Sequence, residues 1–139
     1  MIGAKRAYTA AHARAGLDAE LPDIECFENR FPDYAIDLSF PEFTSVCPRT
    51  GLPDFGTLRI LYRPRRRCLE TKSLKHYLNA YRNLGIFTEN VVNRVLRDVV
   101  RDARPRWAVV EGRFAPRGGI EAVITASFGP APTGKISLG

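Results

Sequence analysis

Cys47 and Asp54 are the residues of this chain whose types and spacing offer covalent chemistry. Both lie in the stretch FTSVCPRTGLPDF, residues 43 to 55. A cysteine attacks as its thiolate, so it needs partial exposure and a neighbour that removes or returns its proton. The prolines and the glycine between the two residues disfavour regular structure, so the chain can loop back and bring the side chains together. The alternatives are a small buried Cys47 and an Asp54 that only forms a turn.

A second cluster, ETKSLKHY at residues 70 to 77, has the spacing of a cationic helix face. Lys72 lies three positions before Lys75 and four before His76, so all three side chains project from one side of a helix. With Ser73 near the positive end of the helix dipole, this face can bind a phosphate. An ordinary solvated face is the alternative.

Phe87, Thr88 and Glu89 form a third cluster at the start of another predicted helix. The carboxylate of Glu89 can simply complement the helix dipole. It can also accept hydrogen bonds from the amino and ring N–H groups of a purine-like base that stacks on Phe87.

The composition is that of one globular domain. The chain has 139 residues, of which 45% are hydrophobic and 26% charged. Its uncharged apolar runs are too short to cross a bilayer, and its N-terminus lacks the apolar core of a signal peptide. The chain has three cysteines, Cys26, Cys47 and Cys68. Their odd number argues against a disulfide framework, and their spacing is not that of a zinc knuckle. We therefore expect a soluble cytoplasmic protein with reduced thiols and no bound metal.

The formal net charge of +6 suits either nucleic acid or a small phosphate-bearing ligand. Much of the basic excess falls in an arginine-rich turn at 63–67 and along a helix at 94–106. On that helix Asp98 and Asp102 interleave with arginines at pair spacing, which indicates a solvated face. Because no aromatic residues interleave as stacking platforms, nucleic-acid binding ranks low.

The periodicity predicts an α+β fold, with an antiparallel sheet covered on one face by two helices. The predicted segments are a loose arm or subunit-contact segment at 1–22, extended segments at 24–31 and 34–40, a strand at 57–63, helices from 71 or 73 to 85 and from 88 to 105, and strands at 107–115 and 120–128. Thr71 or Ser73 is the expected N-cap of the first helix, and Thr88 that of the second. The exposed sheet edges favour side-by-side association, so we expect a homo-oligomer.

The three clusters together resemble the QueF family of NADPH-dependent nitrile reductases, in its single-module form. The resemblance rests on FTSVCPRTGLPDF, ETKSLKHY, YRNLGIFTENVVNRVL and PRGG in that order, and it runs from about residue 24 to residue 128. It implies a tunnelling fold (T-fold), in which subunits join their sheets into a barrel, commonly as two stacked pentameric rings with active sites at subunit interfaces. The implied domains are an arm at 1–22, one catalytic T-fold domain at 23–129 and a tail at 130–139.

The resemblance also implies an activity, the reduction of 7-cyano-7-deazaguanine to 7-aminomethyl-7-deazaguanine for the queuosine base of tRNA. In it Cys47 forms a covalent thioimide with the nitrile, Asp54 supplies and shuttles protons, and two NADPH provide hydrides. The substrate-binding residues would be Glu89, Phe87 and Thr88. The implied NADPH-binding residues are Glu70, Lys72, Ser73, Lys75, Tyr77 and Arg117.

The chain departs from the family pattern at four positions. Thr71 stands where serine or leucine is usual, and His76 where leucine or tyrosine is usual. Thr88 replaces the histidine of the usual Phe-His-Glu, so any proton role of that histidine falls to Asp54 or water. Val91 leaves no second cysteine after the glutamate with which Cys47 could form a protective disulfide.

Three other functions are weighed against the reductase. A QueF-like amidinotransferase shares the cysteine adduct but lacks the cofactor motif that residues 70 to 75 retain. A zinc-dependent pterin enzyme of the same fold would need histidines near Cys47, and His12 and His76 do not have that spacing. A non-enzymatic deazapurine or tRNA binding module would tolerate replacement of Cys47 and, with RNA, would bind in a steeply salt-dependent way.

Overall fold

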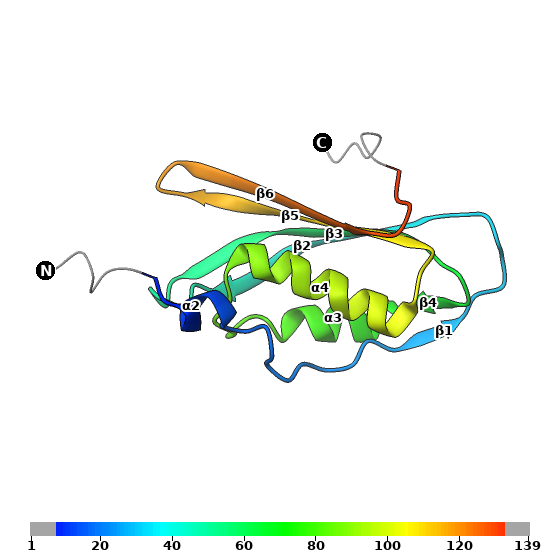
Figure 1. Cartoon of the computed structure of the whole chain (residues 1–139), viewed down its shortest axis with the longest axis horizontal. Helices are drawn as coiled ribbons and strands as arrows, with labels where there is room; N and C mark the ends of the chain where they lie inside the picture. The colour runs from blue at the N-terminus through cyan, green and yellow to red at the C-terminus, as the bar shows by residue number, and fades with distance from the viewer. Residues whose placement is uncertain (1–7, 133–139) are drawn as a thin grey trace, which may run out of the picture.

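The computed structural model describes residues 8–132 as a four-stranded antiparallel sheet with helices on one face (Figure 1). The strand order is β2-β3-β5-β6, and β1 and β4 form a separate two-stranded ladder. The elements are α2 (Ala10–Arg14), β1 (Cys26–Glu28), β2 (Ile36–Val46), β3 (Pro53–Arg63), β4 (Arg67–Leu69), α3 (Thr71–Asn79), α4 (Thr88–Ala103), β5 (Trp107–Arg117) and β6 (Ile120–Phe128). This confirms the α+β prediction, while residues 1–7 of the predicted arm and 133–139 of the predicted tail lie outside the described part.

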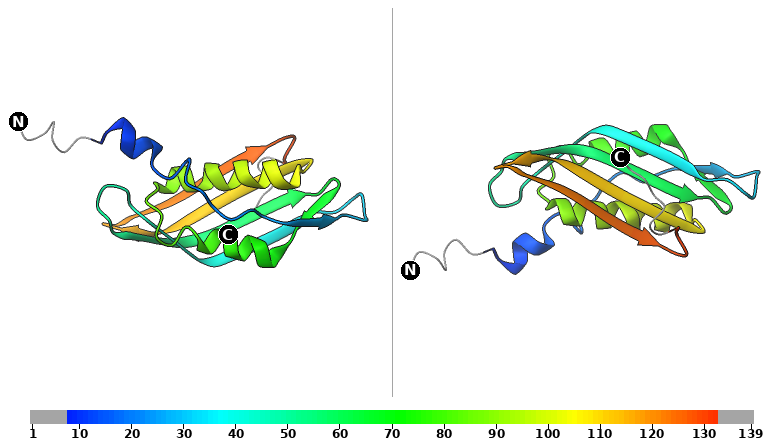
Figure 2. Two further views of the ribbon diagram at one scale, coloured as in Figure 1. Left: turned by 90° about the horizontal axis from the view of Figure 1, so that it is seen from below. Right: turned by 90° about the horizontal axis from the view of Figure 1, so that it is seen from above.

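The two views of Figure 2 show α3 and α4 lying on the same face of the sheet, with no helix of the described chain on the other face. Within the four-stranded sheet, β2 and β3 pair as one hairpin and β5 and β6 as another, while β4 and both helices lie between β3 and β5 in the chain. The β5–β6 turn is made by Gly118 and Gly119, with φ of 68° and 91°. Both residues adopt the positive φ that a two-residue hairpin requires, so the turn lies within the 116–119 gap between the two predicted strands and β5 runs two residues longer than expected.

Strands β2 and β3 extend further toward Cys47 than the sequence predicts. β2 continues past Phe40 because a register shift between Phe40 and Phe43 absorbs the intervening proline. β3 begins at Pro53 rather than at Thr57, since a proline at the first position of a strand needs no ladder hydrogen bond. The predicted loop at 43–55 is therefore reduced to a tight turn.

The short strands β1 and β4 differ from the prediction. Only residues 26–28 of the extended segment expected at 24–31 form a strand, and this strand pairs with Arg67–Leu69. The arginines at 63–67 predict a solvated turn, whereas Arg67 is the first residue of β4, which the sequence does not predict. Three residues are too few to show alternation, so the pairing arises from tertiary contact rather than from a local pattern.

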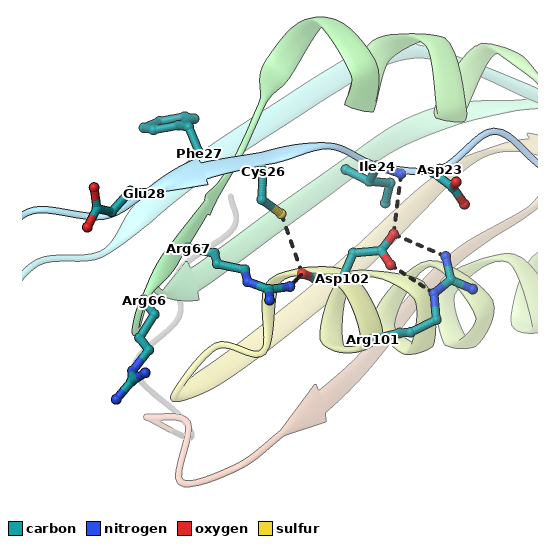
Figure 3. A pocket seen from close by; sticks show the side chains of 9 residues that line it. All are labelled: Asp23, Ile24, Cys26, Phe27, Glu28, Arg66, Arg67, Arg101 and Asp102. Atoms are coloured by element: carbon teal, nitrogen blue, oxygen red, sulfur yellow. Dashed lines mark hydrogen bonds and ion pairs between the residues drawn. The ribbon is translucent and has the colours of Figure 1, made fainter.

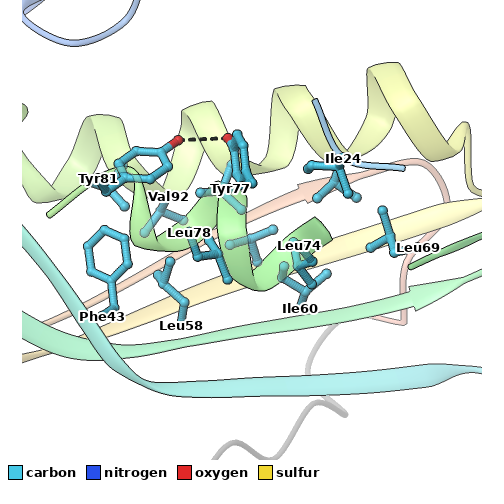
Figure 4. Close-up of a cluster of buried hydrophobic side chains, with 14 of the residues drawn as sticks. Ile24, Phe43, Leu58, Ile60, Leu69, Leu74, Tyr77, Leu78, Tyr81 and Val92 are labelled. Atoms are coloured by element: carbon cyan, nitrogen blue, oxygen red, sulfur yellow. Dashed lines mark hydrogen bonds between the residues drawn. The ribbon is translucent and has the colours of Figure 1, made fainter. Parts of the chain in front are cut away.

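A stripe of valines on α4 forms the centre of the core. Val91, Val92, Val95 and Val99 are fully buried against the sheet, and Leu74, Tyr77 and Leu78 of α3 complete the layer, part of which is drawn in Figure 4. Valine costs a helix at most about 0.7 kcal/mol in propensity, whereas burying its side chain contributes about 1.5–3 kcal/mol. Packing on the sheet therefore holds this helix.

A polar network lies inside this core, where the sequence predicts a solvated helix face. Asp98 is only 1% exposed and Arg94 only 6%, because α3 and the N-terminal segment cover that side of α4. The Tyr77 hydroxyl donates to Asp98, and the Tyr77 and Tyr81 hydroxyls lie 2.8 Å apart. Arg94 Nε donates to the same carboxylate at 3.2 Å, as does Arg101 Nη1. The prediction of a solvated face is wrong for Arg94 and Asp98.

Residues 13–19 of the segment expected to be a loose arm are fastened to α4. Arg94 donates to the carbonyl groups of Gly16 and Ala19, and Arg97 donates to that of Leu17 at 2.7 Å. Gly16 has φ of 82°, and a Cβ placed on it would come within 2.6 Å of Ile86 Cβ. Only glycine permits this close approach without strain, so the position fixes where the segment crosses the start of α4.

Within residues 8–132, no helix is both long enough and apolar enough to cross a membrane.

Replacement of Asp98 by alanine should destabilise the fold strongly. The change leaves the buried Arg94 guanidinium without its carboxylate and the Tyr77 hydroxyl without its acceptor, which should cost about 3–5 kcal/mol. Urea denaturation followed by far-ultraviolet circular dichroism measures the loss. Asp33→Ala removes a carboxylate that is 80% exposed and pairs with Arg63, so it should cost less than about 1 kcal/mol. Equal losses in the two variants would contradict the assigned role of Asp98.

Candidate active site

The turn between β2 and β3 carries Cys47 at its first residue. The Cys47 N–H donates to the Leu52 carbonyl at 2.9 Å, and the Gly51 N–H donates to the Cys47 carbonyl at 3.0 Å. Asp54 lies just inside β3, opposite Ser45. The tight turn thus brings the cysteine and the carboxylate to the same end of the sheet, and the charge of Asp54 acts on the Cys47 thiol.

The environment of Cys47 favours its thiolate. Burial by itself raises the pKa of the thiol, and the charge of Asp54 adds to that effect. Hydrogen bonds from the Thr50 hydroxyl and from the N–H groups of Thr50 and Arg49 stabilise the anion and outweigh both, so the pKa of Cys47 lies below its ordinary value. Sequence reasoning missed Thr50, and its one local signal is a hydroxyl residue within the turn that follows the cysteine.

The environment of Asp54 has the opposite effect. Burial raises the pKa of its carboxyl group, the neighbouring Arg117 lowers it, and the charge of Glu89 raises it, with a net shift upward. Arg117 Nη2 lies 3.3 Å from Asp54 Oδ1, and Arg117 Nη1 donates to the Pro53 carbonyl at 3.1 Å. Asp54 therefore keeps a proton to higher pH than an exposed aspartate does, which suits a proton donor.

Two backbone hydrogen bonds attach the loop before α4 to the end of β2. The Val46 N–H donates to the Leu84 carbonyl at 3.0 Å, and the Ile86 N–H donates to the Val46 carbonyl at 2.9 Å. This parallel bridge, centred on Gly85, brings the start of α4 beside the cysteine turn. A Cβ on Gly85 would lie 3.5 Å from Pro48 Cα, which shows how closely the two segments pack.

Phe87, Thr88 and Glu89 therefore lie next to the cysteine turn. Phe87 is the N-cap of α4 and has no side-chain cap, so the prediction of Thr88 as the cap is wrong. The Thr88 hydroxyl instead donates to Glu89 Oε1 at 3.3 Å and so holds the carboxylate. Phe87 is half-buried and Glu89 is exposed, which leaves a ring and an acceptor available at the same corner.

The predicted cofactor residues on α3 divide into three groups. Glu70 is the N-cap, with its carboxylate accepting the Lys72 and Ser73 N–H groups at 2.8 and 2.7 Å, so neither Thr71 nor Ser73 caps the helix. These backbone hydrogen bonds lower the pKa of Glu70. Lys72 and Lys75 are exposed, whereas Tyr77 is fully buried in the core network.

The ammonium groups of Lys72 and Lys75 fit a phosphate-bearing cofactor in charge and exposure. Lys75 also borders a groove of about 280 Å³ between α3 and the β2 edge, lined by Leu38, Phe40, Leu74 and Leu78 among others. The groove lies roughly 20 Å from Cys47, counted along the intervening residues of β2 at about 3.3 Å each. Within one chain the structure brings Arg117 to Asp54 but keeps the two lysines apart from the cysteine turn.

Another pocket, of about 700 Å³, lies at the C-terminal end of α4, far from Cys47 (Figure 3). Cys26 lines it and donates to the Asp102 carbonyl at 3.5 Å. Burial and the charge of Asp102 raise the pKa of Cys26, so this thiol is a poor nucleophile beside Cys47.

A thiol of lowered pKa, a carboxyl group of raised pKa and an adjacent ring with an acceptor carboxylate are the features that a cysteine nucleophile with acid/base support requires, and here they lie at one end of an α+β sheet. A family model described as "QueF-like protein" matches residues 53–132. The chain belongs to the QueF family, as the sequence motifs predict.

Named relatives agree with this membership. The chain is 57% identical over 122 residues to a protein of Elusimicrobium minutum named NADPH-dependent 7-cyano-7-deazaguanine reductase, covering 87% of this chain and 92% of the relative. A Chloroherpeton thalassium protein of the same name is 50% identical over 107 residues, covering 76% of this chain and 92% of the relative. The apo crystal structure of the archaeosine synthase QueF-Like is 24% identical with a TM-score of 0.65, covering 70% of this chain and 96% of that chain. This last likeness concerns the fold alone.

Alkylation should distinguish Cys47 from the other thiols. Because its pKa is lowered, iodoacetamide near neutral pH should label Cys47 before Cys26, as peptide mass spectrometry measures. Thr50→Val removes the side-chain donor to the thiolate, so the pH profile of Cys47 labelling should move to higher pH and the rate at pH 7 should fall. Thr57→Val, at a threonine in the middle of β3, is the matched control. An unmoved profile in Thr50→Val would contradict the assigned role of Thr50.

Proposed function

We propose that this chain reduces 7-cyano-7-deazaguanine to 7-aminomethyl-7-deazaguanine with NADPH, as an oxidoreductase of queuosine biosynthesis in the cytoplasm. The observation that carries the proposal is the stabilised thiolate of Cys47 beside the part-buried Asp54. The names of the relatives supply the substrate and the cofactor. An amidinotransferase would have no use for the two exposed lysines of α3.

In this proposal the Cys47 thiolate adds to the nitrile carbon, and the nitrile nitrogen takes a proton to give a covalent thioimide. Asp54 supplies that proton, and its raised pKa keeps it protonated closer to neutral pH. Covalent attachment turns a poor hydride acceptor into a better one. When bound, each of two successive NADPH molecules would supply one hydride, and cleavage of the carbon–sulfur bond would release the product and return the Cys47 thiolate. Arg117 Nη2 lies 3.3 Å from Asp54 Oδ1, and its charge lowers the pKa of that carboxyl group.

We propose that Phe87 and Glu89 bind the deazaguanine ring system. Phe87 offers an aromatic face, and Glu89 offers an acceptor for the amino and ring N–H groups of the base. Thr88 holds the Glu89 carboxylate through its hydroxyl at 3.3 Å. Thr88 therefore positions the Glu89 carboxylate, and unlike a histidine at this place it does not titrate near neutral pH.

Lys72 and Lys75 are the proposed partners of the cofactor phosphates. Glu70 and Ser73 organise the helix start beneath them, since Glu70 caps α3 and Ser73 Oγ accepts the Glu25 N–H at 2.8 Å. Tyr77 supports the same helix from inside, through its hydroxyl bonds to Tyr81 and Asp98. A compact positive pair of this kind favours NADPH over NADH through its additional phosphate.

The separation between the lysines and Cys47 supports an assembly of subunits. A neighbouring chain can supply the α3 lysines to a Cys47 site if its sheet continues this one edge to edge. The edges are β2 and β6, and β6 exposes Ile120 and Val123. We propose that residues 23–129 form a T-fold unit and that such units close into a barrel of two stacked pentameric rings with sites between subunits.

The purified chain mixed with 7-cyano-7-deazaguanine and NADPH should oxidise about two NADPH per nitrile, as the two hydride transfers require. Absorbance of the reduced nicotinamide measures the consumption, and protein mass spectrometry detects the thioimide. Cys47→Ala should abolish both, and Cys26→Ala is the matched control that should keep both. An adduct without NADPH consumption would indicate amidinotransferase chemistry, and NADPH consumption in Cys47→Ala would refute the covalent mechanism.

Mixed oligomers test whether one site uses two chains. Cys47→Ala and the double variant Lys72→Ala/Lys75→Ala should each be nearly inactive at low NADPH concentration. Co-expression with different affinity tags should restore roughly a quarter of the activity, because random assortment rebuilds that share of the interfaces. Purification through both tags and the NADPH assay give the readout. A lack of restored activity in verified mixed oligomers would place both groups in one chain.

A further inference from the structure

Tyr8, in the N-terminal segment, lies against the proposed base-binding corner. Its ring centroid is 5.5 Å from that of Phe87, with the planes tilted by 53°. The Arg49 guanidinium lies over the same tyrosine ring, 4.5 Å from its centroid. Both distances fall within the ranges for attractive aromatic and cation–π contacts. Tyr8 thus connects the ring that faces the base with the turn that carries Cys47.

The segment around Tyr8 is built into the fold at this place. Thr9 caps α2, and its N–H donates to His12 Nδ1 at 3.0 Å, while the His12 ring packs edge-on against Tyr8 at 5.5 Å. Further along, Asn90 of α4 donates to the Ala13 carbonyl at 2.7 Å. Gly16 then packs directly on Ile86, the residue before Phe87.

Tyr8 is nevertheless 54% exposed. The contacts with Phe87, Arg49 and His12 hold the ring in place without burying it. An exposed aromatic face beside a binding site offers a flat surface to a planar ligand. Arg49 adds a second connection, because its N–H is one of the donors to the Cys47 thiolate.

We propose that Tyr8 forms an aromatic wall of the deazaguanine site, next to Phe87, and so determines how tightly the base is held over Cys47. This inference rests on the proposed function and adds to it a substrate-binding residue outside the matched motifs. Tyr8 contacts the planar ring system of the substrate and takes no part in proton or hydride transfer. Its contribution therefore belongs to substrate binding.

The test compares Tyr8→Ala and Tyr8→Phe with the unmodified full-length chain. In Tyr8→Ala the KM for 7-cyano-7-deazaguanine should rise about tenfold, which is typical for the loss of one aromatic–base stacking contact, with kcat within about twofold. The Kd measured by calorimetry in the Cys47→Ala background, where no adduct forms, should rise by the same factor. Tyr8→Phe should retain the values of the parent, because it keeps the ring.

Phe31→Ala is the matched control, since it removes an aromatic ring that is 69% exposed and lies between β1 and β2, before the end of β2 that is far from Cys47. It should leave the KM and the Kd unchanged. Gly16→Ala gives an independent variant: it displaces the segment that holds Tyr8 and should raise the KM in the same direction.

The outcomes separate the two hypotheses. If the unmodified chain neither binds nor reduces the nitrile, the proposed function fails and this inference fails with it. If the unmodified chain is active and Tyr8→Ala keeps the KM and the Kd of the parent, only the role of Tyr8 is overturned. Tighter binding by Tyr8→Ala would also overturn it, because the tyrosine would then block the base rather than hold it.

Discussion

Two backbone hydrogen bonds at Val46 are the contact on which the candidate site depends. They join the end of β2 to Leu84 and Ile86, at 3.0 and 2.9 Å, and so determine where α4 begins. Cys47 directly follows Val46 as the first residue of the turn, and Phe87 directly follows Ile86. One short parallel bridge therefore places the proposed nucleophile beside the proposed base-binding cluster, although the two are far apart in the sequence. Ladder bonds of this kind are directional, so they define orientation as well as proximity.

The site shifts the pKa values of two neighbouring groups, Cys47 and Asp54, in opposite directions. Cys47 and Asp54 are both partly withdrawn from water, which raises both pKa values. Hydrogen-bond donors on Thr50 and Arg49 bring the pKa of the thiol below its ordinary value. The charge of Glu89 raises the pKa of the Asp54 carboxyl group further. The result is a pair in which the thiol loses its proton more readily than usual and the carboxyl group keeps its proton to higher pH than usual, as the proposed acid/base-assisted addition requires.

Helix α4 couples this site to the rest of the molecule. Its valines hold it to the sheet, and its buried Arg94 and Asp98 hold both α3 and the N-terminal segment. A hydrogen-bonded charge pair inside a core fixes geometry more than it adds stability, since desolvation offsets much of the attraction. The proposed cofactor helix and the segment that carries Tyr8 are thus both positioned by one element, whose first turn carries Glu89.

The local patterns predicted most of the fold. The valine stripe of α4, the glycine turn at Gly118 and the apolar side of β3 all follow from periodicities that short segments reveal. The sequence also predicts that the chain turns back between Cys47 and Asp54, because proline and glycine at 48, 51 and 53 disfavour regular structure there. Chemistry-bearing residues that lie close together in sequence, such as Cys47 and Asp54, were recognisable for the same reason.

Contacts between distant segments were decided only by the tertiary structure. Burial of Asp98, the pairing of β1 with β4 and the position of Tyr8 on Phe87 depend on elements that no local window contains. The raised pKa of Asp54 belongs to this class too, because burial in the folded chain and the charge of the distant Glu89 cause it. The sequence by itself determined which residues can do the chemistry and which segments are helix or strand, since these follow from side-chain type and local backbone preference. The tertiary structure decided which of those residues meet, because that depends on how the two helices and the N-terminal segment pack on the sheet.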